Sequence, residues 1–265
     1  MRLKTCTILE HLACMKNACL LLVATILLAL TSRAQEDKIE TDRPGESQST
    51  AVVEKGFFQA ENGFRKEQQK NGDYSLFHPR TQLRLGLLKN LELRADVASK
   101  TEKNSSGQDS RNGLQPVELG LKAKIWEGKG ALPTASFYTQ VGIPNWASEE
   151  LQKEDVFPRV RMLFENKLSN NFKLLYNAGA EWQGDGGPPQ WLYTLQPELQ
   201  FGDKWEAFAE TYAYLQSGQA AKQYVDAGVG FYPHHNIKLD VWGGKGLSAE
   251  SLDYFFSAGI SFRFK

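Results

Sequence analysis

Cysteine is scarce in this chain and is confined to its first residues, as Cys6, Cys14 and Cys19. Residues 1–34 have the pattern of a secretory signal peptide, with basic residues, an apolar run at 18–30 and small residues before Gln35. Translation starts at Met1 or at Met15, and the pattern allows both. Cleavage would leave an exported chain without disulfides, thiol catalysis or thiolate metal sites.

Long apolar runs and an excess of either charge are also lacking. The run at 18–30 has about 13 residues, fewer than the roughly 20 that a membrane-spanning helix needs, which favours a cleaved signal over an uncleaved anchor. Residues 1–34 hold four of the 31 basic residues and one of the 31 acidic residues, leaving 27 and 30. A net charge near −3 lacks the basic excess of a nucleic-acid binder, so we predict no nucleic-acid partner.

Histidine is too sparse to support catalysis. After residue 34 the chain contains only His78, His234 and His235. A hydrolase would need serine and histidine with an orienting group. Adjacent turn histidines project apart and have no carboxylate ligands nearby, so they make a poor metal site. The glycine-rich stretch 184–187 lacks the strand-to-helix context of a phosphate-binding loop. We predict that the chain is not an enzyme and uses no cofactor or metal.

The chain is instead filled with stretches of about ten residues in which apolar and polar side chains alternate. Leu83, Leu85 and Leu87 alternate with Arg84, and residues 91–97 repeat the pattern with Glu92, Arg94 and Asp96. A strand projects successive side chains to opposite faces, so each such strand has one apolar face and one charged face. We count about 12 strands between residues 58 and 264.

The connections between these strands alternate in length. Five are short, at 89–90, 127–130, 169–171, 203–204 and 234–236, and the six others are longer and more polar. An even number of strands with alternating turns predicts an all-β fold, an up-and-down antiparallel transmembrane β-barrel of about 12 strands. Its short turns would be periplasmic and its longer loops outer, with lipid outside the wall and water within.

A soluble antiparallel sandwich would also show alternating strands, so further observations are needed. Trp146 lies in a predicted loop, and five tryptophans lie near predicted strand ends, where barrels carry aromatic girdles at the membrane interfaces. These five are Trp126, Trp182, Trp191, Trp205 and Trp242. Charges on the polar faces would be costly in a dry core unless they were paired. Both observations favour the barrel.

The exported chain divides into two predicted parts, an N-terminal periplasmic or plug segment at 35–55 and the barrel at 56–265. The segment contains Thr41, Asp42, Arg43 and Pro44. These residues could form a plug whose Asp42 and Arg43 pair with lumen charges. They could also form a turn that docks the segment against the first strand. We favour the turn, because proline and aspartate commonly set turns.

Charges of both signs are predicted to face the lumen. They could tune solute selectivity, or they could cross-link strands through ion pairs and narrow or close the pore, and the sequence favours neither interpretation. The main candidates are Arg84, Glu92, Arg94, Asp96, Lys122, Lys124, Arg161, Glu181, Glu198 and Glu210, with Glu118, Arg159, Glu165 and Glu206 on the same faces.

Aromatic residues are also predicted to point inward, because their neighbours on the chain belong to the outer face. They are Phe208, Tyr212, Tyr214, Tyr224 and Tyr232. Tyr212, Tyr214 and Tyr224 are candidates for stacking against an apolar ring in transit. We favour the simpler interpretation that they fill space in the interior.

Two elements near the start of the exported chain resemble a known family. They are Glu40-Thr41-Asp42-Arg43-Pro44 and the stretch from Gly56 to Phe64, which contains Gly-x-x-Gln-x-Glu. They resemble the opening of the family named for the MetA pathway of phenol degradation. This resemblance implies an outer-membrane barrel with a transport role and small aromatic or other apolar cargo. The chain ends Phe264-Lys265, whereas outer-membrane barrels usually end on an aromatic residue that the assembly machinery reads.

We therefore expect an outer-membrane channel for passive uptake of small solutes, exported by a cleaved signal peptide. Its expected partners are outer-membrane lipid, the outer-membrane assembly machinery and the solutes themselves. Two alternatives remain. One is a barrel without flux that serves envelope structure or adhesion, and the other is a soluble exported β-sandwich that binds a ligand.

Overall fold

A computed structural model describes residues 38–106 and 110–265, so the predicted signal peptide lies outside the described residues. No helix within these ranges has the length and apolar character that crossing a membrane requires. The strands are β1 (Phe58–Gln68), β2 (Tyr74–Leu88), β3 (Leu91–Lys103), β4 (Ser110–Leu114), β5 (Val117–Trp126), β6 (Thr134–Ile143), β7 (Phe157–Lys167), β8 (Phe172–Glu181), β9 (Gln190–Phe201), β10 (Trp205–Gln216), β11 (Lys222–His234), β12 (Ile237–Gly246) and β13 (Tyr254–Phe264). Two short 3-10 turns, η1 (Pro144–Trp146) and η2 (Glu149–Leu151), lie between β6 and β7.

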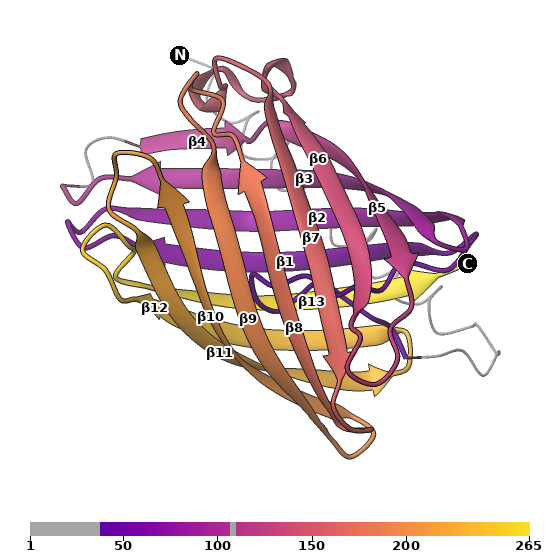
Figure 1. Ribbon diagram of the computed structural model, residues 1–265. Helices are drawn as coiled ribbons and strands as arrows, with labels where there is room; N and C mark the ends of the chain where they lie inside the picture. Colours follow the sequence, from indigo (N-terminus) through magenta and orange to yellow (C-terminus); the bar gives the residue numbers. More distant parts are fainter. Residues whose placement is uncertain (1–37, 107–109) are drawn as a thin grey trace, which may run out of the picture.

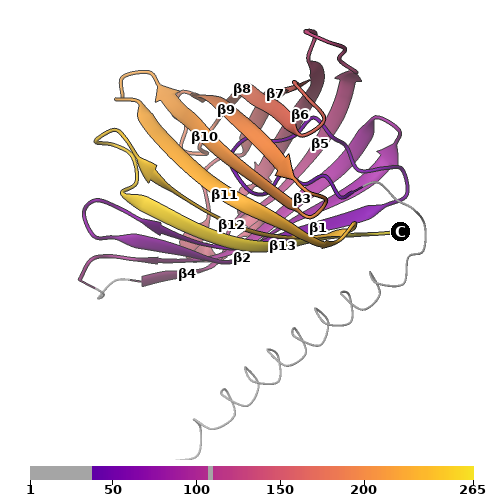
Figure 2. The same ribbon diagram turned by 90° about the horizontal axis from the view of Figure 1, so that it is seen from below.

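These strands form one closed antiparallel barrel (Figures 1 and 2). The last strand pairs with the first, from Phe58 opposite Phe264 to Gln68 opposite Tyr254. Each remaining strand pairs with its neighbours around the ring. Apart from β4, which pairs on one side only, every strand of the described chain has a neighbour on both sides, as a wall in hydrocarbon requires.

Strands β4 and β5 share one place in the wall. The end of β3 near the longer loops, from Ser99 to Lys103, pairs with β4. The other end of β3, from Leu91 to Asp96, pairs with β5. Pro116 lies between β4 and β5 and has no backbone N–H to donate to the ladder. The 13 strands therefore fill 12 positions around the ring. This confirms the predicted fold and excludes the sandwich.

The two ends of the barrel differ in the length of their connections, as predicted. Two to four residues join β2 to β3, β7 to β8, β9 to β10 and β11 to β12, and seven residues, 127–133, join β5 to β6 at the same end. The connections at the other end have five to 13 residues. The C-terminus lies at the end with the short turns (Figure 1). Strands β3 and β12 continue beyond their alternating residues into polar stretches, to Lys103 and Gly246. Those stretches have no apolar face, so alternation could not reveal that their backbones still pair.

The apolar faces of the strands form the outside of the wall. Leu85, Leu93 and Leu121 are 38%, 39% and 39% exposed, so they do not share a dry centre. Four tryptophans at or next to strand ends are also exposed: Trp126, Trp182, Trp191 and Trp205. Our placement of Trp242 near a strand end with the girdle was wrong. It lies within β12, points inward and is 7% exposed, because its position has the inward parity of Lys238 and Asp240.

The charged faces of the strands line the interior, but they do not border a wide aqueous lumen. The side chains of Arg84, Glu92 and Lys122 are completely buried. The expectation of a water-filled interior is therefore wrong for the part of the barrel that contains these three side chains. The reason is that the chain before β1 occupies this space.

Candidate functional site

The inner segment, defined here as residues 38–57, has no regular secondary structure and is surrounded by the strands. It contacts strands on all sides of the ring. Asp42 meets Lys122 of β5, Arg43 meets Asp240 of β12, and Ser47 bonds Thr194 of β9 at 2.6 Å. Opposite walls of the barrel are therefore joined through this segment.

Side chains of the barrel accept hydrogen bonds from the backbone of the inner segment. Asp42 and Arg43 donate their N–H groups to Glu61, at 3.0 and 3.1 Å. Glu46 and Ser47 donate theirs to Glu210, at 2.7 and 2.6 Å. A buried backbone without a strand partner needs such acceptors. The acidic side chains of the wall thus accept the backbone hydrogen bonds that a neighbouring strand would accept in a sheet.

Gly45 allows the inner segment to approach the wall closely. Its φ is +106°, a region that other residues rarely adopt. A Cβ at this position would lie 2.6 Å from Oε1 of Gln196. A side chain here would therefore strain the backbone and force Gln196 to move.

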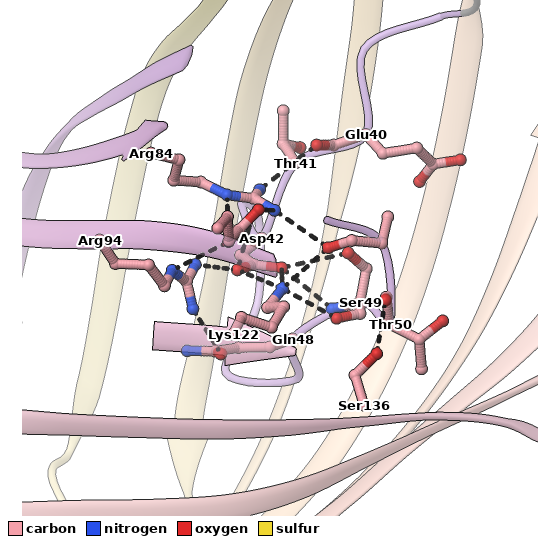
Figure 3. A network of polar contacts seen from close by, with 12 residues as sticks. Glu40, Thr41, Asp42, Gln48, Ser49, Thr50, Arg84, Arg94, Lys122 and Ser136 are labelled. Carbon is pink, nitrogen blue, oxygen red and sulfur yellow. Dashed lines mark hydrogen bonds and ion pairs between the residues drawn. The ribbon is translucent and has the colours of Figure 1, made fainter. Parts of the chain in front are cut away.

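Asp42 is the centre of the largest ionic cluster (Figure 3). Its carboxylate accepts bonds from Nζ of Lys122 at 2.9 Å to both oxygens, and from Arg94. Ser49, in the same segment, donates its N–H and its hydroxyl to Asp42 at 3.1 Å. Both oxygens of this buried carboxylate therefore accept hydrogen bonds.

Arg84 links the same cluster to the wall. Its guanidinium forms two 2.9 Å bonds with Glu92 and one 2.7 Å bond with Glu61, and it lies 3.9 Å from Asp42. It also donates to the carbonyl of Ala51 at 3.1 Å. Paired arginine–carboxylate bonds of this type are among the stronger polar contacts in proteins.

The cluster keeps Asp42 ionised. Burial acts to raise the pKa of this carboxyl, but the nearby charges of Lys122, Arg84 and Arg94 outweigh it and hold the pKa well below its usual range. Asp42 therefore remains charged in mildly acidic solution. Near the short-turn end, Glu40 is half exposed, and the charge of Lys173, 3.3 Å away, lowers the pKa of its carboxyl.

A second anchor lies on the opposite wall. Arg43 donates to Asp240 at 2.9 Å and to Ser257 at 3.0 Å. A Cβ on Gly63 would lie 2.1 Å from this guanidinium, and one on Gly259 would lie 2.5 Å from it. Two glycines thus leave the space that Arg43 occupies against the wall.

The predicted interior charges have the following places. Arg84, Glu92, Arg94, Asp96, Lys122, Arg161, Glu181, Glu198 and Glu210 all point inward and are buried. Lys124 differs, because it lies near the short turn after β5 and pairs with exposed Glu127 at 3.1 Å. The contacts of Asp42 and Arg43 match the alternative that we ranked second, pairing with interior charges, although both residues also dock on Glu61 of the first strand.

The predicted inward aromatics also lie inside the barrel. Tyr212 and Tyr224 stack with ring centroids 4.7 Å apart, and Tyr214 meets Tyr212 edge-on at 5.9 Å. Leu192 packs with them. Phe208 belongs to a neighbouring cluster with Trp242 and Phe255, and Tyr232 donates to Glu206. The three tyrosines are packed against one another on the wall formed by β10 and β11.

A cavity of about 110 Å³ lies between the inner segment and the ends of β1 and β2 that lead to the longer loops. Its lining includes Glu67, Phe77, Arg80, Arg159, Arg161 and Trp242.

Sequence reasoning did not single out Phe77, Arg80 or Phe255, and it misplaced Trp242. Strand parity could have placed Trp242 inward. The irregular pairing between Phe77 and Arg80 breaks parity in β2, so no periodic signal could have found Phe77.

Comparisons with known proteins agree with this architecture. A family model described as "Putative MetA-pathway of phenol degradation" matches residues 41–264. No curated protein matches the chain in sequence. Among solved structures, an outer membrane channel from Pseudomonas putida F1 is 10% identical and superimposes with a TM-score of 0.66, over 83% of this chain and 99% of that chain.

Two porins are also similar in structure. The KdgM porin in complex with disordered oligogalacturonate is 9% identical, with a TM-score of 0.54 over 77% of this chain and 99% of its own. The NanC porin is 11% identical, with a TM-score of 0.51 over 77% and 98%. At these identities the similarity establishes a shared barrel fold.

Proposed function

The chain belongs to the family described as "Putative MetA-pathway of phenol degradation", and from this membership we propose that it is an outer-membrane channel. It takes up small solutes passively, aromatic or apolar compounds among them. It reaches the outer membrane after cleavage of the signal peptide at residues 1–34, and the assembly machinery inserts it there. It carries out no catalysis.

The observation that carries this proposal is the distribution of side chains on a closed wall. Leucines such as Leu93 and Leu121 are exposed outside, while charged residues such as Arg94 and Lys122 lie inside. Hydrocarbon accepts a closed barrel because its backbone bonds are all internal. In water the same outer surface would be an extensive exposed apolar area, which soluble monomers rarely have.

In this proposal the inner segment is a plug that controls passage. Its contacts with Lys122, Asp240 and Glu210 span the interior, so a solute must pass beside it or displace it. The charges around it then tune which solutes pass, and Tyr212, Tyr214 and Tyr224 offer ring faces to aromatic cargo. The mixed signs of the interior charges favour no strong preference for anions or cations.

One observation favours a second candidate, a barrel without flux that serves the envelope structurally. The ion pairs of the interior are buried and directly bonded, as in the case of Arg84 with Glu92 and Glu61. A network of this kind could serve only to brace the wall. The longer loops would then be the functional surface, through adhesion or contacts with other envelope components.

A solute-entry experiment separates the two candidates. The full chain is reconstituted in liposomes, and swelling is followed with small polar aromatic compounds and with sugars of similar size. The channel proposal expects aromatic compounds to enter faster than in protein-free vesicles. Entry of no solute above that background would support the structural role. Unheated and boiled samples run on a gel verify that the barrel is folded, because a folded barrel migrates differently.

A further inference from the structure

The cavity between the inner segment and the longer loops has the features of a ligand site. We propose that it binds monocyclic aromatic carboxylates, with Arg80 pairing with the carboxylate, Trp242 donating its indole N–H, and Phe77 contacting the ring. The proposal rests on the channel function and deepens it by naming a class of solute and the residues that select it.

The acidic residues of the cavity are already engaged. Glu46 pairs with Arg161 at 2.7 Å, Glu67 with Arg65 at 2.9 Å, and Glu61 with Arg84 at 2.7 Å. Asp42 is held by its own cluster, and Asp96 accepts bonds from Gln82 and Gln140. A cationic solute would have to displace one of these partners.

Arg80 differs from the other arginines of the cavity. Its side chain is 46% exposed, and its one ionic partner among the described residues is Asp96, with a nitrogen–oxygen distance of 3.9 Å that is too long for a hydrogen bond. By contrast, Arg43, Arg65, Arg159 and Arg161 each lie within 3.1 Å of a carboxylate oxygen. An arginine with open donors suits a carboxylate, which it can bind through two parallel bonds.

Trp242 supplies an independent sign of a missing partner. Its side chain lines the cavity and is only 7% exposed, yet its Nε1–H has no acceptor among the residues that the structure describes. The ring is held edge-on against Phe255, with centroids 5.0 Å apart. A buried donor without an acceptor is unfavourable, and a ligand oxygen would satisfy it.

Strand register places Phe77 and Trp242 in one row of the wall. Phe77 of β2 lies opposite Arg65 of β1, which lies opposite Ser257 of β13, which lies opposite Trp242 of β12. Arg65 covers Trp242, with its guanidinium carbon 5.0 Å from the ring centre. Aromatic side chains therefore flank the row, and Arg80 lies in the next row, opposite Gly63.

The size of the cavity limits the ligand to one ring. Its volume is about 110 Å³, whereas an engineered apolar cavity of roughly 150 Å³ binds benzene. The cavity is smaller than that one, so it can enclose at most one ring, and the carboxylate has to extend toward the half-exposed side chain of Arg80. A fused aromatic system exceeds this space.

Binding is tested on the full chain folded in detergent, with benzoate as the probe. Calorimetric titration measures its affinity, and Trp242 provides a fluorescence signal. Benzyl alcohol keeps the ring without the charge, and acetate keeps the charge without the ring. We expect saturable binding of benzoate that neither of the two reference compounds matches. Equal affinity for benzyl alcohol and benzoate would overturn the proposal.

Three variants test the assigned residues. Arg80→Gln removes the guanidinium, and we expect benzoate to bind roughly tenfold or more weakly, since a charged hydrogen bond is lost. Trp242→Phe keeps a ring but removes the N–H, and we expect a roughly two- to tenfold loss. Arg111→Gln is the matched control, because Arg111 is exposed on β4 and pairs with Glu102 outside the cavity. Unchanged benzoate affinity in Arg80→Gln, with the gel shift of a folded barrel, would overturn the assignment.

Failure of this inference differs from failure of the channel function. If liposomes with the protein admit polar aromatic compounds but benzoate does not bind, the channel stands and the site does not. If benzoate binds with the predicted effects of Arg80→Gln but no solute enters, the site stands and the channel function fails.

Discussion

Asp42 shows how a buried charge inside this barrel is compensated. A lone carboxylate buried in a dry interior would lose its hydration, which is strongly unfavourable. Here Lys122, Arg94 and Ser49 direct donors at it from two strands and from its own segment. The charges of this cluster are thus compensated by one another and not by bulk water. Removing a single member leaves its partners uncompensated.

Asp42→Asn should release the inner segment. The amide keeps the shape of the side chain but removes the charge that Lys122 and Arg94 require, and breaking such a buried pair costs about 3–5 kcal/mol. We expect faster solute entry into liposomes and faster cleavage of residues 38–57 by added protease. Asp203→Asn, in an exposed turn, is the control and should behave like the parent chain. Equal solute entry and cleavage in all three proteins would show that Asp42 does not hold the segment.

The same carboxylate predicts a pH dependence. The pKa of Asp42 is lowered by folding, so its contribution to stability is complete above the ordinary pKa of 3.8 and is lost as the pH falls through the lower, folded value. We expect the conductance of a planar bilayer containing the protein to be constant from about pH 8 to pH 5. It should increase only below about pH 4. A rise between pH 7 and pH 5 would mean that another group controls the segment.

At the scale of the elements, alternation was sufficient wherever one face of a strand meets lipid. The strand expected through residues 91–97 lies within β3, and four of the five short turns lie within one residue of their expected places, whereas the turn expected at 127–130 extends to residue 133. Alternation failed where both faces are polar, as in β3 beyond Lys100 and in β4. It also could not reveal the irregular pairing in β2 between Phe77 and Arg80.

A pair of leucines tests whether lipid covers the outer face. Leu121 lies within β5 at 39% exposure, and Leu132 lies in a short turn at 58% exposure. Leu121→Arg should lower the free energy of unfolding in lipid vesicles by about 2–4 kcal/mol, and Leu132→Arg by about 0–1 kcal/mol. Urea unfolding followed by tryptophan emission measures both values. If the two substitutions had the same small effect, the outer face would not be embedded in hydrocarbon.

At the scale of the whole molecule, the sequence did not predict how the inner segment fills the barrel. Asp42 and Lys122 are 80 residues apart, and Arg43 and Asp240 are 197 residues apart. The inner segment has no periodicity, so no pattern specifies which wall residue each of its side chains meets. The sequence therefore predicted the wall and its polar interior, but it could not decide between a docked turn and a segment bonded across the interior.

A reversible cross-link tests whether the inner segment must move. The hydroxyl oxygens of Ser47 and Thr194 are 2.6 Å apart, close enough for a disulfide after Ser47→Cys and Thr194→Cys. The three native cysteines all lie in residues 1–34, so export leaves no competing thiol if the signal is cleaved. We expect solute entry to fall when the double variant is oxidised and to recover on reduction. Equal entry in both states would show that solutes pass beside a stationary segment.

The inner segment also has a mechanical consequence for the wall. Lys122 on one side and Asp240 on the other are both tied to adjacent residues, Asp42 and Arg43. These two contacts hold opposite strands of the barrel at fixed distances from the inner segment. The cross-section therefore resists flattening. Lateral pressure in the bilayer that distorts the barrel must also strain the contacts of the inner segment.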